Sequence, residues 1–277
     1  MANEFISDLF SVKDKVVAIT GGGGILCSAM AQALARAGAR VAVLDIMDAA
    51  ANKTAEEITA AGGDARAFHI DVLDRAAVQA CANEVLAHFG RIDALINGAG
   101  GNKKQATTSP DLSFFDLPQD AFQWVFNLNF VGTLLPTQVF GKLLAEQGEG
   151  AILNIASVNA FRPLTNIPAY SAAKAAVKNF TEWLAVHISQ NYSTSIRVNA
   201  IAPGFALTEQ NRFLLTDAQT GAPTKRGNII IGHTPMGRYF EPEELVGTVI
   251  WLLSPASSFV HGVTVLVDGG FCAFSGV

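Results

Sequence analysis

Short, continuously apolar runs alternate with longer amphipathic segments along the chain. Runs that are apolar at every position, rather than at every second one, are typical of parallel strands buried on both faces. Helical periodicity fills the intervals, so the alternation predicts an α/β fold with a doubly wound parallel sheet of about seven strands. The expected strands are 16–19, 40–45, 65–71, 93–97, 151–157, 195–203 and 263–270. The expected helices are 28–38, 54–62 and 75–90, with others after Asp120, Tyr170 and Pro242.

Two connections are too long for plain turns: 100–122 after the fourth strand and 205–238 after the sixth. Both leave the carboxyl ends of central strands, where open α/β sheets bind ligands. We therefore expect two ordered substrate lids, named lid 1 and lid 2 below. No linker, composition shift or repeat interrupts the pattern, which favours a single domain over 1–277.

Composition narrows the classes of function. Half of the 277 residues are hydrophobic and the net charge is −5, which disfavours a nucleic-acid or anionic-membrane surface. The three cysteines have no CxxC pair and the five histidines no metal-ligand spacing, so we expect neither zinc, disulfides nor a catalytic metal. The polar N-terminus is unlike a signal peptide, and no apolar run reaches membrane-spanning length, so we expect a cytoplasmic protein.

The stretch TGGGGILC, residues 20–27, stands between a predicted strand and a predicted helix. Backbone amides at such a helix N-terminus favour a pyrophosphate, and the pattern from Gly22 fits G-x-G-x-x-G/A with Cys27 as the small third residue. A tight turn without a ligand is the alternative. Ile25 is β-branched and avoids positive φ, so any left-handed residue is expected among the glycines before it.

Asp45 ends the second strand, at the distance from the loop at which a carboxylate binds the adenosine ribose. An acid there repels a 2′-phosphate, and neither Ile46 nor Met47 supplies a cation, so the sequence favours NAD over NADP. Asp71 ends the third strand, and is expected either to contact the adenine amine or to cap the following helix.

The segment YSAAK places Tyr170 and Lys174 on one helix face. Tyrosine has a pKa of about 10, so it is a base at neutral pH only where positive charge lowers that pKa. We expect the Lys174 ammonium and a nicotinamide to do so, Ser157 to hydrogen-bond the same substrate oxygen, and Asn129 to hold a water that relays protons. An exposed aromatic–lysine pair is the alternative, and the combination of residues favours catalysis.

From about Lys13 to its end, the sequence resembles the short-chain dehydrogenase/reductase family. The motifs that carry the resemblance are TGGGG (20–24), Asp45, Asp71-Val72, INGAG (96–100), NFVG (129–132), NIAS (154–157), YSAAK (170–174), RVNAIAPG (197–204) and VDGG (267–270). The resemblance implies a Rossmann-type fold, a homotetramer and an NAD-dependent enzyme in which Tyr170 is the general acid/base, Lys174 binds the nicotinamide ribose, Ser157 steadies the reacting oxygen and Asn129 completes the relay. It implies cofactor contacts at Gly21, Gly22, Gly23, Gly24, Ile25, Leu26, Asp45, Asp71, Val72, Asn97, Gly98, Ala99, Tyr170, Lys174, Pro203, Gly204 and Thr208. The sequence differs from the family loop at Ile25 and Cys27, which predicts altered loop geometry with binding retained.

Within this family the sequence is similar to the D-mannonate oxidoreductases (fructuronate reductases) of the short-chain type. The matching stretches are TGGGGILC (20–27), NGAGGN (97–102), 128–142, 163–187, APGFALTEQNR (202–212) and TPMGR (234–238). The resemblance implies a sugar-acid substrate. Gluconate-type 5-dehydrogenases and 3-oxoacyl reductases are the alternatives. A non-catalytic NAD-binding scaffold would have lost the serine, the tyrosine or the lysine, all of which are present.

A sugar acid needs a cation for its carboxylate, and amides and hydroxyls for its own hydroxyls. The candidates at the lids are Asn102, Asn159, Arg162, Gln210, Asn211 and Arg212. We interpret Lys103, Lys104 and Lys225 as ordinary solvated loop residues, and expect Trp183 and Leu184 to pack between subunits or in the core.

Overall fold

The protein was studied as a computed structural model that describes residues 2–207, 212, 215–217 and 219–276. Its strands are β1 (Val16–Thr20), β2 (Arg40–Asp45), β3 (Asp64–His69), β4 (Ala94–Asn97), β5 (Gly150–Ile155), β6 (Ile196–Pro203) and β7 (Thr264–Val267). Its helices are α1 (Ala2–Leu9), α2 (Ile25–Arg36), α3 (Asp48–Ala60), α4 (Arg75–Phe89), α5 (Gln119–Phe126), α6 (Gly132–Gln147), α7 (Pro168–Asn191), α9 (Lys225–His233) and α10 (Val246–Leu253). Short helical turns are η1 (Lys104–Ala106), η2 (Phe114–Asp116), η3 (Asn127–Val131), η4 (Val158–Ala160), η5 (Pro242–Leu245) and η6 (Pro255–Ser257).

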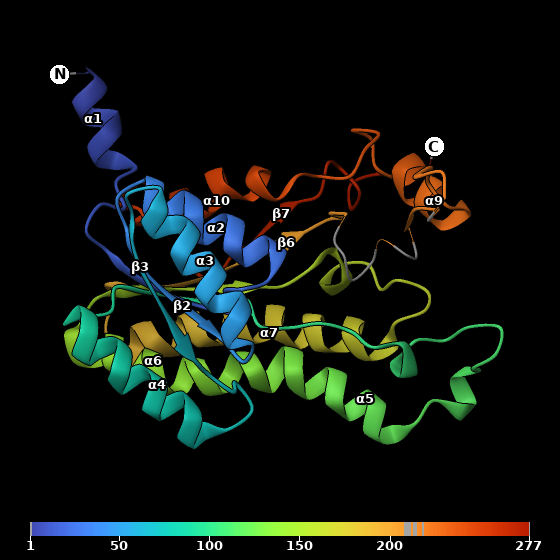
Figure 1. The fold of residues 1–277 in the computed structure, drawn as a ribbon, viewed down its shortest axis with the longest axis horizontal. Coiled ribbons are helices and arrows are strands. Elements are labelled where there is room, and N and C mark those ends of the chain that lie inside the picture. The colour runs from blue at the N-terminus through green and yellow to red at the C-terminus, as the bar shows by residue number, and fades with distance from the viewer. Residues whose placement is uncertain (1, 208–211, 213–214, 218, 277) are drawn as a thin grey trace.

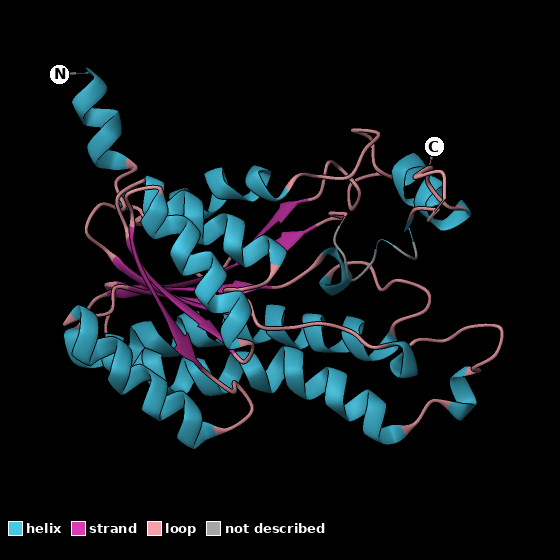
Figure 2. Ribbon diagram, in the orientation of Figure 1, coloured by secondary structure: helices cyan, strands magenta, loops and turns pink. Residues whose placement is uncertain are grey.

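One parallel sheet of seven strands forms the centre of the fold, in the order β3-β2-β1-β4-β5-β6-β7 (Figure 2). The chain runs outward from β1 to β3, then returns to place β4 on the other side of β1. This reversal confirms the predicted doubly wound α/β fold, and ligands of such folds bind beside the reversal at the carboxyl ends of the strands.

Helices cover both faces of the sheet, with α2, α3 and α10 on one side and α4, α6 and α7 on the other (Figure 1). Strand β1 shows why its residues are apolar throughout. Val17 and Ile19 pack with the first set of helices, whereas Val16 and Ala18 pack with the second. Both faces of β1 are therefore core, as its continuous apolar run predicts.

Several element boundaries differ from the sequence prediction. Helix α2 begins at Ile25 rather than at residue 28, and α3 begins at Asp48 rather than at residue 54. The prediction followed amphipathic periodicity, which neither Ile25-Leu26-Cys27 at the start of α2 nor the three alanines after Asp48 show. Strand β5 ends at Ile155, so Ser157 lies two residues beyond the strand.

Both long connections leave the carboxyl edge of the sheet, at the end opposite α4 in Figure 1. Lid 1 contains the turns η1 and η2, and its last residues, from Gln119, belong to α5. The described part of lid 2 contains α9, and Phe240 N donates to Phe205 O at 2.9 Å where the lid rejoins the sheet. No described helix has the length and apolar character that crossing a membrane requires.

Candidate active site

The glycine loop, residues 21–24, joins β1 to α2 at the reversal of the sheet. Gly21 has φ +66°, a conformation that residues with a side chain rarely adopt. This confirms the prediction that the left-handed residue is a glycine before Ile25. Gly24 is the N-cap of α2, and the first turn carries neither a side-chain cap nor an acidic residue. The amide groups at this helix start, including those of Ile25 and Leu26, form an end that attracts anions.

The loop is held against β2 through close contacts and one carboxylate. A Cβ at Gly22 would lie 2.7 Å from Cγ1 of Val43, so this contact permits only glycine. Asp45 accepts hydrogen bonds from Gly23 N to Oδ2 at 3.0 Å and from Met47 N to Oδ1 at 2.9 Å. The carboxylate is thus fixed at the outer edge of the loop, where it favours hydroxyl groups and repels a phosphate.

Cys27 packs directly against the residue that follows β4. A Cβ added at Gly98 would lie only 2.2 Å from Sγ of Cys27, so the cysteine fits because its neighbour is glycine. Burial raises the pKa of the Cys27 thiol to about 12, and this thiol is therefore unreactive at neutral pH. Thr20, which sequence analysis missed, accepts hydrogen bonds from Gly98 N and Ala99 N at 3.1 and 3.2 Å. It fixes the backbone of the β4 connection to β1.

The side chain of Asn97 does not lie at the surface of this edge. Its Nδ2 donates to Thr137 Oγ1 at 2.9 Å and to Asn154 Oδ1 at 2.8 Å, inside the core between β4, β5 and α6. The Asn97 side chain is therefore engaged in the core, and the contact of this residue with the adenosine side of a cofactor stays a prediction. Successive side chains of a strand point to opposite faces of the sheet, and the side chain of Asn97 lies on a face that is covered by the core.

Two other residues predicted to bind the cofactor, Asp71 and Val72, lie shortly after the third strand, β3. Asp71 Oδ1 accepts from Leu73 N at 2.9 Å, whereas the N-cap of α4 is Asp74. Asp71 is therefore not the helix cap, which removes the alternative interpretation of this residue. Val72 is buried and packs against Gly132. A Cβ added at Gly132 would lie 2.9 Å from Cγ2 of Val72.

The end of β6 approaches the turn after β7. Pro203 is buried and is the last residue of β6. A Cβ at Gly204 would lie 2.9 Å from Cα of Asp268, so glycine is required by this contact. Thr208, Gln210 and Asn211 lie outside the described residues.

Ser157, Tyr170 and Lys174 come together where β5 and the start of α7 meet. Tyr170 hydrogen-bonds to Ser157, and Nζ of Lys174 lies 5.6 Å from the centre of the Tyr170 ring. The ammonium donates to Ile155 O at 2.7 Å, and burial lowers the pKa of Lys174 to about 8. These three side chains form the arrangement that the sequence predicts.

The electrostatics of Tyr170 differ from the prediction. Burial raises its pKa above 10, and the hydrogen bond with Ser157 acts in the opposite direction. We expected Lys174 to lower this pKa. The ammonium is directed to a backbone carbonyl instead, and its own charge is destabilised by burial. The protein alone therefore keeps the phenol protonated at neutral pH, and ionisation requires added positive charge.

Asn129 lies in the π-helical turn η3 between α5 and α6. Its Nδ2 donates to Gly101 O at 2.6 Å and to Val125 O at 2.8 Å, and its Oδ1 accepts from Gly101 N at 3.2 Å. The amide thus fixes the start of lid 1 to the helix. A Cβ at Gly100 would lie 2.6 Å from Asn129 Oδ1 and 3.4 Å from Lys174 Nζ, so Gly100 separates the two side chains. Single π-turns inside helices are frequent at functional sites.

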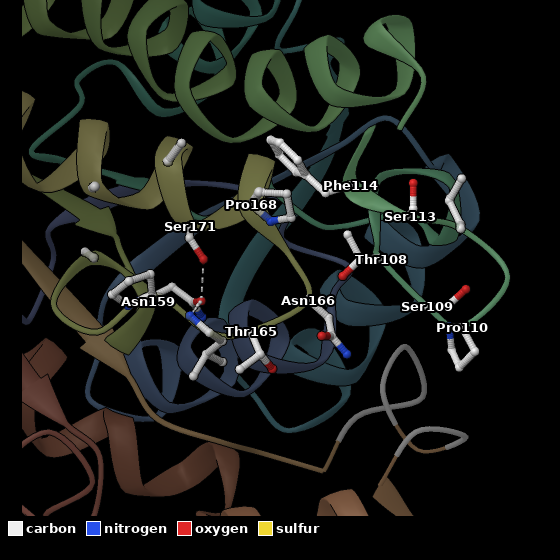
Figure 3. Close-up of a pocket in the computed structure, with 16 residues that line it drawn as sticks. Thr108, Ser109, Pro110, Ser113, Phe114, Asn159, Thr165, Asn166, Pro168 and Ser171 are labelled. Carbon is white, nitrogen blue, oxygen red and sulfur yellow. Dashed lines mark hydrogen bonds between the residues drawn. The ribbon is translucent and has the colours of Figure 1, made fainter. Parts of the chain in front are cut away.

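A cavity of about 970 Å³ opens between lid 1, residues 163–168 and the start of α7 (Figure 3). Asn159 and Ser171 line it, whereas Ser157, Tyr170 and Lys174 do not. Thr108 N of lid 1 donates to Asn166 O at 2.9 Å and joins the two walls. The lining is uncharged and mixes hydroxyl and amide groups with apolar ones. The polar lining residues are Thr108, Ser109, Ser113, Asn159, Thr165, Asn166 and Ser171.

Asn159 lines this cavity, but its amide is engaged within the protein. Nδ2 donates to Ser157 Oγ at 3.2 Å, and Oδ1 accepts from Ser171 Oγ at 2.9 Å. It is 5% exposed. The structure therefore places it behind the serine rather than as a free group facing a substrate.

The remaining described residues that were predicted to contact substrate do not line the cavity. Asn102 is exposed and donates to Thr107 Oγ1 at 2.9 Å, and Arg162 and Arg212 are exposed. Lys103 is partly exposed, and its Nζ lies 4.7 Å from the ring centre of Trp124, a contact that the sequence did not predict. That contact joins lid 1 to α5.

The chain is similar to oxidoreductases over nearly its whole length. A family model described as enoyl-(acyl carrier protein) reductase matches residues 24–272. An uncharacterized oxidoreductase of Haemophilus influenzae is 49% identical over 279 aligned residues, which span 96% of each chain. The range matched by the family model includes Gly24, Asp45 and the Ser157–Tyr170–Lys174 group.

Two solved structures share the fold in full. A protein of Haemophilus influenzae with bound NAD, described provisionally as a D-mannonate oxidoreductase, is 48% identical with a TM-score of 0.90 and covers 98% of this chain and 100% of its own. A gluconate 5-dehydrogenase of Burkholderia cenocepacia in complex with NADP and tartrate is 31% identical with a TM-score of 0.86, covering 97% and 99%.

Proposed function

Because the chain belongs to the short-chain dehydrogenase/reductase family of oxidoreductases, we propose that it interconverts a secondary alcohol and a ketone on a sugar acid, with NAD(H) as the cofactor. We propose D-mannonate and D-fructuronate as the substrate pair. The observation that carries the reaction class is the hydrogen-bonded Ser157–Tyr170 pair beside buried Lys174. The 48% identical structure with bound NAD supports both the cofactor and the substrate pair.

The residues at the carboxyl edge fit a dinucleotide. The uncapped start of α2 would hold the pyrophosphate, and Asp45 would accept hydrogen bonds from the ribose hydroxyls. Lys174, one turn beyond Tyr170 on α7, would reach the nicotinamide ribose. The bound cofactor supplies the hydride chemistry, while the protein supplies position and electrostatics. Asp45 repels a 2′-phosphate, which favours NAD over NADP.

Tyr170 handles the proton in this proposal. Its oxygen takes the hydroxyl proton of the alcohol during oxidation and returns it during reduction. Ser157 donates a hydrogen bond to the reacting oxygen and holds it near Tyr170. The positive charge of the oxidised nicotinamide would lower the pKa of Tyr170, against the effect of burial. Asn129 and Lys174 lead the proton onward through a relay.

The cavity lined by Asn159 and Ser171 suits the hydroxyl-rich part of a sugar acid, because its walls offer hydroxyl and amide groups. It offers no charged side chain for a carboxylate among its lining residues. We propose that the exposed side chain of Arg162 or Arg212 pairs with that carboxylate. In that arrangement the keto end of the substrate would face Ser157.

The test follows NADH oxidation by the purified protein with D-fructuronate, and NADPH as the parallel cofactor. We expect turnover with NADH that exceeds turnover with NADPH, and we expect Tyr170→Phe to abolish both. Turnover of D-fructuronate that survives in Tyr170→Phe would contradict the catalytic assignment. Absence of turnover in the wild type would remove D-mannonate and D-fructuronate as the pair.

A gluconate-type 5-dehydrogenase is the second candidate, and the 31% identical structure with tartrate and NADP favours it. Gluconate and its 5-keto form belong in the same assay. Higher kcat/KM with 5-ketogluconate than with D-fructuronate would make this candidate the better one.

We further propose that the chain forms a homotetramer and works in the cytoplasm. The assembly is consistent with exposed aromatic side chains on two separate elements, Trp183 on α7 at 56% exposure and Phe259 before β7 at 103%. Leu184 beside Trp183 is buried in the core, which is one of the two alternatives predicted for it, whereas packing of Trp183 between subunits stays a prediction. Light scattering on the eluted protein would give the mass of the assembly.

A further inference from the structure

A buried amide stands behind the Ser157 hydroxyl and determines which way that hydroxyl points. Asn159 lies in the turn η4, two residues after Ser157, and its side chain points toward the start of α7 (Figure 3). Its hydrogen bonds form one network with those of Ser157 and Ser171. The direction of each bond in this network follows from groups that can only donate.

The amide orientation of Asn159 is set by a backbone group. Leu164 N lies 3.3 Å from Asn159 Oδ1, and a backbone N–H can only donate, so the atom facing it must be oxygen. Ser171 Oγ donates to the same oxygen at 2.9 Å. The amino end of the amide therefore faces Ser157 and can only donate to it.

Two donors consequently converge on one hydroxyl. Asn159 N and Asn159 Nδ2 each lie 3.2 Å from Ser157 Oγ. A serine hydroxyl has two acceptor positions and one proton, and both acceptor positions are filled by these groups. Its proton is left for another acceptor, and the Ser157 hydroxyl acts on Tyr170 in the direction that lowers the pKa of Tyr170.

We propose that Asn159, supported by Ser171, is a positioning residue that makes Ser157 a hydrogen-bond donor toward Tyr170 and the reacting oxygen. The inference rests on the proposed dehydrogenase chemistry for its consequence. A donated hydrogen bond favours the phenolate form of Tyr170, which is the form that accepts the proton of an alcohol. Without Asn159, the serine could turn its proton elsewhere.

Few charged groups compete with this effect. Lys174 lies on the same helix as Tyr170, and the Cys27 thiol on α2 interacts electrostatically with Lys174. Arg162, which is exposed, interacts electrostatically with the Cys272 thiol. Among the described residues, no hydrogen bond joins any of these four side chains to Ser157 or Asn159.

Three variants, Asn159→Asp, Asn159→Ala and Ser171→Ala, separate the effect of the direction of the Ser157 hydrogen bond from the effect of an added negative charge. Aspartate has the shape of asparagine but only accepts, so it draws the Ser157 proton away from Tyr170. The alanine variants remove the donor or its support without adding charge. We expect the pH profile of kcat for alcohol oxidation to move upward by about one pH unit in Asn159→Asp, with about tenfold lower kcat at pH 7. Both alanine variants should move it in the same direction by less, with unchanged KM for NAD.

The matched control is Asn83→Asp, which adds the same charge on the exposed side of α4. Its pH profile should equal that of the wild type. A shift in Asn159→Asp alone, with none in the two alanine variants, would assign the effect to charge and overturn the proposal. A lower melting temperature with unchanged pH profiles would assign Asn159 a purely structural part and overturn it as well.

A second measurement needs no substrate. The protein has three tyrosines, so ¹³Cζ-labelled tyrosine gives three NMR signals, of which Tyr170→Phe identifies one. We expect the ionised fraction of Tyr170 at a pH of about 10.5, near the ordinary tyrosine pKa, to be lower in all three variants than in the wild type. If the wild type turns over no sugar acid, the proposed function fails while this titration still decides the role of Asn159; an equal ionised fraction in all proteins would refute it.

Discussion

The buried positive charge of Lys174 lowers the free energy of unfolding of the protein. Its side chain is 4% exposed, and burial lowers its pKa from 10.5 to about 8. At about 1.4 kcal/mol for each pH unit, this difference destabilises the fold by about 3 kcal/mol at pH 7. The hydrogen bond from Nζ to Ile155 O returns about 1 kcal/mol. We therefore predict that the free energy of unfolding of Lys174→Met exceeds that of the wild type by about 2 kcal/mol at pH 7.

The sign of the pH dependence follows from proton binding. The unfolded protein binds a proton at Lys174 below pH 10.5, whereas the folded protein binds it only below about pH 8. The cost is therefore complete below pH 8, declines between pH 8 and 10.5, and vanishes above. At a pH of about 9.5 the stabilisation by Lys174→Met should have fallen by about 2 kcal/mol, to near zero.

Urea unfolding followed by circular dichroism at the two pH values, about 7 and about 9.5, gives the two free energies. Lys53→Met is the matched control, because the side chain of Lys53 is 78% exposed on α3 and the substitution removes the same charge. Its effect should change little between the two pH values. A Lys174→Met protein that is less stable than the wild type at neutral pH, or equally stabilised at both, would refute the reasoning. The variant should also lose turnover.

Three further predictions concern the site. Tyr170→Phe should lower kcat by about 10²–10⁴-fold while the Kd for NADH, measured by fluorescence, changes little, because the lost group acts as acid and base. Asp45→Asn keeps an acceptor for Gly23 N but removes the charge, so the ratio of kcat/KM with NADPH to that with NADH should rise about tenfold; an unchanged ratio would show that Asp45 does not select the cofactor. Gly98→Ala places a Cβ 2.2 Å from Sγ of Cys27 and should destabilise the fold by about 1–3 kcal/mol in thermal unfolding, whereas the double variant with Cys27→Ala should recover part of that loss.

Strand positions were readable from the sequence because burial on both faces leaves a signal at every residue. The run at β1 is apolar throughout, and all its residues are buried. Helix starts were less readable, since α3 opens with three alanines after Asp48 that carry no amphipathic pattern. The sequence predicted a doubly wound parallel sheet with crossovers, whereas the order of its strands in space came only from the structure.

The residues of the candidate site also differ in how far the sequence reveals them. Tyr170, Lys174 and Ser157 were found because each bears a chemistry that few residue types supply at that spacing. The parts that sequence analysis missed act through hydrogen-bond direction. Thr20 and Ser171 are ordinary hydroxyl residues, and only the structure shows that one fixes two backbone amides and the other an amide oxygen. Which end of the Asn159 amide faces the serine depends on Leu164 N, five residues away in the sequence.

The atypical glycine loop is consistent with binding of a pyrophosphate, because Ile25 and Cys27 both fit the backbone and the space at their positions. Ile25 is the first residue of α2 and has right-handed helical backbone, so it needs no glycine, and its side chain is 39% exposed. The left-handed turn falls on Gly21, four residues earlier, where a family loop and this one agree. Cys27 points inward, and the space for its Sγ is provided by Gly98 just after the neighbouring strand. The requirement for a small residue is thus shared between α2 and the end of β4, and the amides at the start of α2 stay open to a phosphate.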